Sequence, residues 1–172
     1  MIMILNPNEI NFVELTLTTR VPDHFIENNQ VIDPVIAGKI ELDRKYRQEF
    51  STAIPRSNPC NYYNCHGLTF ASRRTRVINS NEIQIILEDD SYKQIENIRN
   101  VMPGDIVVYY QEGDAQHSAI VINVDLTTVL TQVKVVSKWG EGSEFIHLIN
   151  DCPYARDSDE IKYYRVHSVE HE

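Results

Sequence analysis

Three short β-rich runs follow one another between residues 106 and 137, and this succession constrains the fold more than any other feature of the chain. The runs span residues 106–110, 117–124 and 129–137, with polar stretches at 111–116 and 125–128 between them. β-Branched and aromatic residues dominate each run, which is typical of strands. Strands joined by short connections pair antiparallel, because a parallel pair needs a long crossover. The sequence therefore predicts a small antiparallel meander.

Helical spacing of isoleucines and leucines precedes the meander, at residues 81–87 and 92–98. Two further apolar runs, at 145–149 and 161–166, are candidate closing strands of the sheet. Helices that precede a small antiparallel sheet are typical of the α+β class.

The first fifty residues carry no catalytic motif. Residues 10–18 alternate between apolar and polar side chains, which predicts a strand, and residues 40–50 predict a short charged helix. We expect residues 1–50 to form an N-terminal extension, which gates the substrate site or binds a protein partner, and residues 51–172 to form the main domain. An irregular, proline- and asparagine-rich arm at 51–64 leads into that domain.

Cys65 stands at the predicted start of a helix, directly after Asn64, which is a favourable N-cap residue. Leu68 and Ala71, followed by Thr75 and Ile78, would form one face of this helix. Free backbone N–H groups and the helix dipole stabilise a thiolate at such a position. The sequence therefore predicts a thiol pKa below the ordinary value of about 8.5.

A cysteine nucleophile requires a base that accepts the thiol proton and a group that orients this base. His117 lies at the predicted beginning of the second strand, where its ring can reach across to a helix N-terminus. Cys65 and His117 together predict a nucleophile and its general base.

These motifs resemble the NlpC-like and CHAP-like cysteine peptidases and amidases over residues 55–140. The matching motifs are Asn64-Cys65-His66-Gly67 at a helix start, Gly104-Asp105-Ile106-Val107-Val108-Tyr109 in a strand, and His117-Ser118-Ala119-Ile120-Val121 in the next strand. The resemblance implies a minimal papain-like fold, with helices packed on a small antiparallel sheet. It also implies a hydrolase that cleaves amide bonds without a cofactor, through a thioester on Cys65.

The third catalytic position departs from the pattern of these families. There, a His, Asn, Gln or Glu usually follows on the strand after the histidine strand, whereas this chain has Ser137 and Lys138. A serine oxygen can accept a hydrogen bond from imidazole and an ammonium group cannot. Lys138 is expected to pair with Glu141 or Glu144, and His147 is a further candidate for the third position.

Four residues are candidate substrate contacts: Tyr62, Asn64, His66 and Trp139. The backbone N–H of Cys65 would form an oxyanion hole with a side-chain donor from Tyr62 or Asn64. His66 points away from Cys65 by about 100° on a helix, so packing is its alternative role. The expected substrate is a peptide, an isopeptide or an amide like those of peptidoglycan stems.

Other functions stay open at this point. A thiol acyltransferase, similar to a transglutaminase, would use the same residues, and a catalytically inactive binding module would keep the same fold. Cys60, Cys65, His66 and Cys152 provide four potential zinc ligands, but they lack the closely spaced pairs of structural zinc sites. We therefore expect no metal.

The charge balance argues against nucleic acid as a partner. Sixteen Lys and Arg stand against 25 Asp and Glu, a net charge of −9, and such a field repels polyanions. The basic cluster of Arg73, Arg74 and Arg76 is expected to form ion pairs or a solvated helix face. Residues 1–5 are too short an apolar run for a secretory signal, and no run is long enough to span a membrane. Together with three cysteines, an odd number, this favours a cytoplasmic protein, although export that is independent of a signal stays open.

Overall fold

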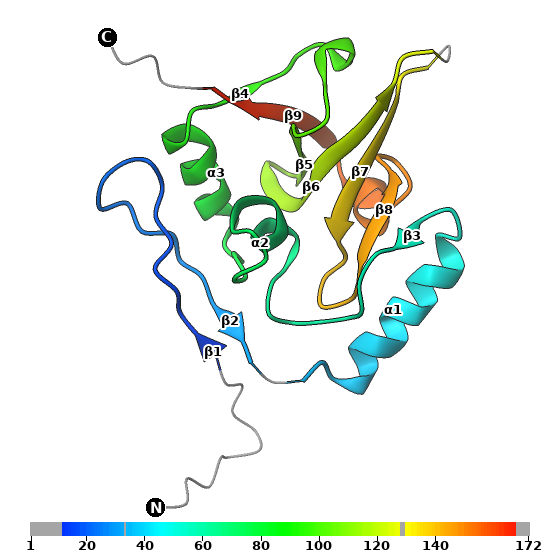
Figure 1. Cartoon of the computed structure of the whole chain (residues 1–172), viewed down its shortest axis with the longest axis horizontal. Helices are drawn as coiled ribbons and strands as arrows, with labels where there is room; N and C mark the ends of the chain where they lie inside the picture. Colours follow the sequence, from blue (N-terminus) through cyan, green and yellow to red (C-terminus); the bar gives the residue numbers. More distant parts are fainter. Residues whose placement is uncertain (1–11, 33, 128–129, 168–172) are drawn as a thin grey trace, which may run out of the picture.

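The computed structural model describes residues 12–32, 34–127 and 130–167. Within these ranges, seven strands form one antiparallel sheet, so the protein combines helices with an antiparallel sheet as expected (Figure 1). From one edge to the other the strands are β3 (Ile54–Pro55), β8 (Glu144–Leu148), β7 (Gln132–Lys138), β6 (Asp114–Asp125), β5 (Ile106–Gln111), β9 (Glu160–Val166) and β4 (Tyr92–Gln94).

The predicted meander is confirmed, because β5, β6, β7 and β8 are sequential neighbours in the sheet. The turn between β5 and β6 is tighter than expected. Glu112 and Gly113 both have positive φ, 52° and 87°, as in the two-residue turns that match the twist of a hairpin. As a result β6 begins at Asp114, and His117 lies inside the strand rather than at its beginning.

The described helices are α1 (Ala37–Glu49), α2 (Cys65–Phe70), α3 (Ser80–Asp89), a 3₁₀ turn (Ile98–Asn100) and α4 (Pro153–Asp157). The predictions for α1 and α3 are confirmed. The predicted helix at 92–98 is wrong, because Tyr92–Gln94 forms edge strand β4 against β9. The helix that begins at Cys65 is also shorter than predicted. Ser72 and Arg73 adopt positive φ after Phe70, so Thr75 and Ile78 lie beyond the helix.

The N-terminal strand is also shorter than predicted. Only β1 (Phe12–Val13) is a strand, and it pairs with β2 (Gln30–Val31) in a separate two-stranded sheet of the described chain. Residues 14–17 are irregular, Thr18 forms an isolated β-bridge with Phe25, and residues 10 and 11 lie outside the described residues.

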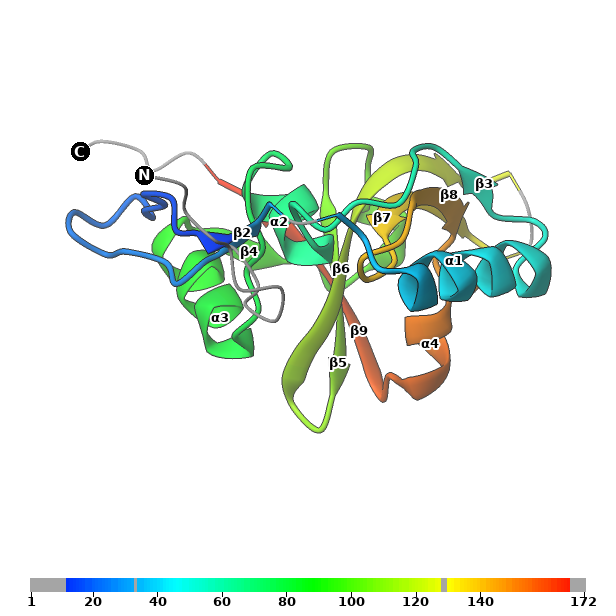
Figure 2. The same ribbon diagram turned by 90° about the horizontal axis from the view of Figure 1, so that it is seen from below.

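Two apolar cores lie on opposite faces of the large sheet, because successive residues of a strand point to opposite faces. One core contains Tyr109, Ala119, Val121, Val135, Trp139 and Phe145, with Tyr46 of α1 and Tyr154 of α4 packed against it. The other contains Ile106, Val108 and Tyr110 with Ile83, Ile86 and Leu87 of α3. The ribbon places α1 and α4 towards one end of the molecule and α3 towards the other (Figure 2).

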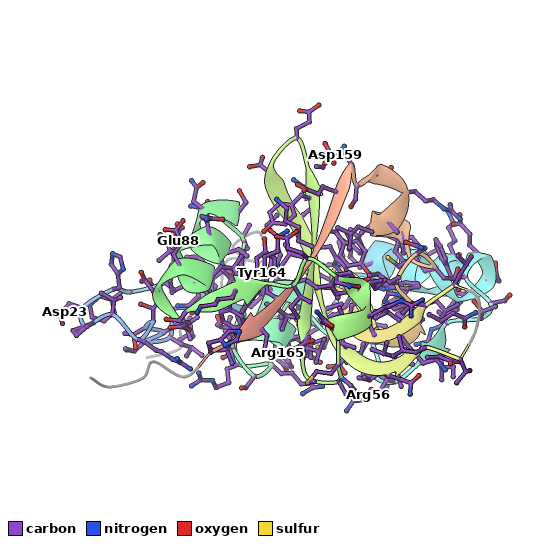
Figure 3. All side chains as sticks on the ribbon, turned by 90° about the horizontal axis from the view of Figure 1, so that it is seen from above. Asp23, Arg56, Glu88, Asp159, Tyr164 and Arg165 are labelled. Atoms are coloured by element: carbon purple, nitrogen blue, oxygen red, sulfur yellow. The ribbon has the colours of Figure 1, made fainter. Side chains whose placement is uncertain are left out.

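The turn before β5 is tied to the neighbouring strand β9. Asp105 is buried, and its carboxylate accepts hydrogen bonds from the backbone N–H of Met102 and from the Arg165 guanidinium at 2.7 and 2.8 Å. Arg165 projects from β9 next to Tyr164 in the sequence (Figure 3). This pair joins the start of β5 to β9.

In the described part of the chain, no helix has the length and apolar character needed to cross a membrane.

Candidate active site

Cys65 begins α2, as the sequence predicts, and Asn64 caps the helix. The Asn64 side-chain oxygen accepts hydrogen bonds from the N–H groups of Gly67 and Val77, at 2.9 and 3.2 Å. Its amide nitrogen donates to the carbonyl of Val77 at 2.6 Å. The side chain of Asn64 therefore anchors the start of the helix to the segment that follows it.

Gly67 allows α2 to lie close to that same segment. A Cβ atom at this position would lie 1.8 Å from the carbonyl oxygen of Thr75, a distance that no side chain tolerates. Glycine is therefore required two residues after the cysteine, and it fixes how the helix start is presented to the sheet.

The Cys65 sulfur is buried, and burial determines its protonation. Burial raises the pKa of the Cys65 thiol to about 11. The backbone N–H groups of Ser118, His66 and Cys65 itself, and the nearby Lys138 ammonium, lower this pKa but do not outweigh burial. The predicted depressed pKa is therefore wrong in direction, although the expected N–H groups do face the sulfur. At rest, Cys65 is a neutral thiol.

His117 lies on the face of β6 opposite to Ser118, between two tyrosine rings. Its imidazole stacks on the ring of Tyr154, with centroids 3.9 Å apart and planes within 5°. Tyr109 lies on another side, with its ring centroid 5.2 Å away. Burial, reinforced by His147 and His66, holds the pKa of His117 well below its usual range, so the ring is neutral.

Neither ring nitrogen of His117 has a hydrogen-bond partner in the portion of the chain that the structure describes. The side chain is fully buried, and a buried polar group without a partner is rare and costly in a folded protein. Such groups concentrate where a protein uses them for chemistry or holds a further molecule.

Cys65 and His117 share two neighbouring residues, Ser118 and Tyr154. The N–H of Ser118, the residue after His117, faces the Cys65 sulfur. Tyr154, which stacks on His117, has a hydroxyl whose pKa is raised first by burial and then by Cys65. The nucleophile and the base proposed from the sequence therefore border the same tyrosine, although no hydrogen bond joins them.

Ser137 and His147 form a pair of their own. The Nδ1–H of His147 donates to the carbonyl of Leu148 at 2.8 Å, because a carbonyl only accepts. Its Nε2 therefore accepts from the Ser137 hydroxyl at 2.8 Å, and Ser137 accepts from the Trp139 indole at 3.0 Å. Burial lowers the pKa of His147 to about 4, which keeps the ring neutral. Neither candidate for the third catalytic position forms a hydrogen bond to His117.

Lys138 is fully buried and donates to the carbonyl of Gly142. Of the two acids that the sequence suggested for it, Glu144 is close enough to act on its pKa. The Glu144 carboxylate is occupied by Tyr63 at 2.7 Å and by Arg73 at 2.6 Å, so the ion-pair interpretation is confirmed for Arg73.

The candidate substrate contacts differ in exposure. Tyr62 is half exposed, whereas Trp139 is buried and stacks on Phe145 with ring centroids 4.0 Å apart. His66 is buried, with Nδ1 2.9 Å from the Ser118 hydroxyl oxygen and Nε2 donating to the carbonyl of Ala115 at 3.2 Å. Burial lowers the pKa of His66 to about 4. These contacts attach α2 to β6.

A pocket of about 160 Å³ adjoins the site on the side of α1. Its lining residues are Lys39, Leu42, Asp43, Tyr46, Trp139, Gly140, Glu141, Gly142 and Tyr154. Tyr154 therefore separates this pocket from His117. Neither Tyr154 nor Tyr109 is a site residue predicted from the sequence: Tyr109 ends the quoted strand motif, and no local motif contains Tyr154.

Among the residues with described positions, no group of three or more His, Cys, Asp or Glu side chains is arranged to hold a metal ion. The four potential zinc ligands of the sequence thus do not form a site. Cys152 instead lies in the core beside Tyr109.

Comparison of the chain with protein families, curated proteins and solved structures finds no match. The residues of the site are therefore the basis for assigning a function.

Proposed function

We propose that the protein is a cysteine-dependent hydrolase of amide bonds, with Cys65 as nucleophile and His117 as general base. The observation that carries this proposal is the fully buried imidazole of His117, whose two nitrogens have no hydrogen-bond partner among the described residues. Cys65 lies near Tyr154, the tyrosine whose ring stacks on this imidazole. A structural histidine in such a place would be expected to use its nitrogens, as His66 does.

The proposed reaction begins from a neutral pair. His117 accepts the thiol proton of Cys65 while the sulfur attacks the carbonyl carbon of the substrate and forms a C–S bond. The backbone N–H of Cys65 stabilises the negative oxygen of the tetrahedral intermediate. His117 then gives its proton to the leaving amine, and the C–N bond breaks. Water next loses a proton to His117 and attacks the thioester, the C–S bond breaks, and the sulfur regains its proton.

We propose with it that the fold is of the minimal papain-like type, similar to that of the NlpC-like and CHAP-like hydrolases. In that arrangement a cysteine at a helix start is opposed by a histidine on an antiparallel sheet. The proposed substrates are peptides, isopeptides or amides similar to those of peptidoglycan stems. We retain the division at residue 50 as part of the proposal. Within the extension, α1 lines the pocket beside Tyr154, where it can gate access to the site.

A cleavage assay tests the proposal. The full chain is incubated with a panel of linear peptides, isopeptide-linked peptides and muropeptide stems, and new amines and acids are identified by mass spectrometry. Cys65→Ala and His117→Gln should each lower the rate by at least about a thousandfold while the fold is retained. Cys60→Ala is the matched cysteine control and should remain active. Cleavage by Cys65→Ala at the wild-type rate would refute the assignment.

A second assay needs no substrate. The rate at which iodoacetamide alkylates each of the three cysteines is measured by peptide mapping at pH 7. If His117 assists removal of the thiol proton, His117→Gln should slow alkylation of Cys65 at least about tenfold and leave Cys60 unchanged. Equal rates at Cys65 in both proteins would contradict a functional pair.

One observation favours a second candidate, a catalytically inactive binding module of the same fold. The Cys65 thiol is buried, its pKa is raised to about 11, and it forms no hydrogen bond to His117 among the described groups. Alkylation of Cys65 that does not depend on His117, together with absence of cleavage across the panel, would favour this module over the hydrolase.

A further inference from the structure

The base of the proposed hydrolase lacks the usual means of orientation. A catalytic imidazole is normally held by a hydrogen bond from its second nitrogen to a polar side chain. In the described structure both nitrogens of His117 are without such a bond, and the candidates Ser137 and His147 bond to each other. Another contact must therefore keep the ring in place.

Tyr154 makes the closest aromatic contact with His117. The two rings are parallel within 5° and their centroids are 3.9 Å apart, so they stack face to face. Tyr109 limits the ring on another side, at 5.2 Å and a tilt of 55°. Rotation of the imidazole out of its plane would drive it into Tyr154, because protein interiors are packed without free space.

We propose that Tyr154 is the positioning residue of His117 and replaces, by ring stacking, the hydrogen-bonding third residue of the catalytic group. This inference rests on the proposed function of the Cys65–His117 pair. Tyr154 acts through His117, since the ring holds the imidazole in the orientation from which it reaches the sulfur of Cys65.

The backbone around Tyr154 is suited to this role. Pro153 begins α4, and the carbonyl of Tyr154 accepts hydrogen bonds from the N–H and the hydroxyl of Ser158, at 3.2 and 2.8 Å. At the other end of the side chain, the N–H of Gly140 faces the phenol oxygen. Both ends of Tyr154 are thus fixed, which leaves the ring little freedom to leave the imidazole.

The contact also has a consequence for the proton transfer. When His117 takes the proton of Cys65 it becomes a cation, and the face of an aromatic ring attracts a cation. The same ring that orients the neutral base therefore stabilises its protonated form. Both effects require an aromatic ring and neither requires the hydroxyl.

The test compares three substitutions by the alkylation rate of Cys65 in the full chain at pH 7. Tyr154→Leu should lower this rate about 10- to 100-fold, because a displacement of about 1 Å costs a reaction on the order of a hundredfold. Tyr154→Phe, which keeps the aromatic ring, should alkylate at close to the wild-type rate. Tyr164→Leu is the matched control, since Tyr164 is also a partly buried tyrosine but packs against the core on the other face of the sheet, with its hydroxyl 2.9 Å from that of Tyr110. It should leave the rate within about threefold.

A double substitution separates positioning from a general loss of structure. If Tyr154 acts only through His117, Tyr154→Leu should have no further effect in a His117→Gln background. A merely structural residue would lower the rate equally in both backgrounds.

The outcomes distinguish the two proposals. If His117→Gln slows alkylation and Tyr154→Leu does not, the role of Tyr154 is overturned and the proposed hydrolase stands. If His117→Gln has no effect, the Cys65–His117 pair is refuted, and the role of Tyr154 with it.

A measurement on the wild-type protein covers the case in which Tyr154→Leu does not fold. Nuclear Overhauser contacts between the His117 and Tyr154 rings, with an upfield ring-current shift of the His117 imidazole protons, are expected. Absence of both would overturn the inference without any variant.

Discussion

Replacement of His117 by phenylalanine should stabilise the fold while it abolishes the proposed activity. The imidazole is fully buried, and its two nitrogens are unpartnered within the described chain. Its neighbours Tyr109 and Tyr154 are aromatic, so a phenyl ring keeps the stacking contacts. The substitution removes two uncompensated polar atoms and retains the apolar packing.

The magnitude follows from the cost of those atoms. A buried polar group without a partner costs about 1–3 kcal/mol, so two nitrogens set an upper limit of about 6 kcal/mol. A phenyl ring is slightly larger than imidazole, and overpacking in a dense core costs about 1–3 kcal/mol. The free energy of unfolding should therefore rise by about 1–3 kcal/mol.

Two other histidines provide matched controls, because their nitrogens have partners. His66→Phe would remove the imidazole donor from the carbonyl of Ala115, and His147→Phe would leave the buried Ser137 hydroxyl without its acceptor. Each should lower the free energy of unfolding by about 1–3 kcal/mol. The three substitutions are chemically identical, so the sign of the change reports whether the nitrogens are satisfied.

Urea unfolding at pH 7, followed by far-ultraviolet circular dichroism, measures all four proteins. The comparison is valid when the dependence of the free energy on urea is the same for each. A loss of 1 kcal/mol or more in His117→Phe, on the order of the control losses, would mean that its nitrogens are hydrogen-bonded in solution. That result would refute the reasoning and remove the main support for a catalytic His117.

Three further predictions concern stability. The pKa values of His66 and His147 are about 4 in the folded protein against 6.5 as the ordinary value, so the unfolded chain binds more protons between these values. Stability is therefore full above pH 6.5 and should fall steadily towards pH 4, as urea midpoints at half-unit intervals would show. Gly67→Ala should lower the free energy of unfolding by about 1–3 kcal/mol, because its Cβ would meet a backbone carbonyl. Gly38→Ala, whose Cβ would have no atom within 4 Å, should raise the free energy of unfolding by up to about 1 kcal/mol in the same assay. Glu144→Gln should lower the free energy of unfolding by about 1.5–3 kcal/mol, because the charged hydrogen bonds of the buried carboxylate are lost. An unchanged melting temperature would contradict this expectation.

Local patterns in the sequence are sufficient to predict most of the sheet. The strands β5 to β8 and β9 were expected because β-branched runs alternate with turns. The run and the turns that bound it lie within a few residues of one another for each strand. The cap at Asn64 was predictable for the same reason, since it satisfies N–H groups of its own helix. By contrast, residues 92–94 have helical spacing but pair with β9, which lies about seventy residues later. No local pattern contains that partner.

The site was only partly predictable for the same reason. Cys65 and His117 were identified by residue type and by their positions relative to a helix and a strand. The thiol pKa was predicted in the wrong direction, because burial dominates it and burial is a property of the assembled core. Tyr154 was missed because its role exists only through a ring contact with a residue 37 positions earlier in the chain.

The two walls of the site are attached to the rest of the fold by contacts of different strength. The helix of Cys65 is attached to the sheet by buried hydrogen bonds from His66, which are expensive to break. The helix of Tyr154 is attached to α1 by the ion pair of Arg156 with Glu49 and by the position of Arg156 over Phe50. These charged side chains are exposed, and exposed ion pairs contribute about 1 kcal/mol or less. The contact of Arg156 with Glu49 is therefore the weaker attachment and the less costly one to break, whereas Tyr154, which packs against the core and stacks on His117, stays in place with the sulfur and its N–H donors.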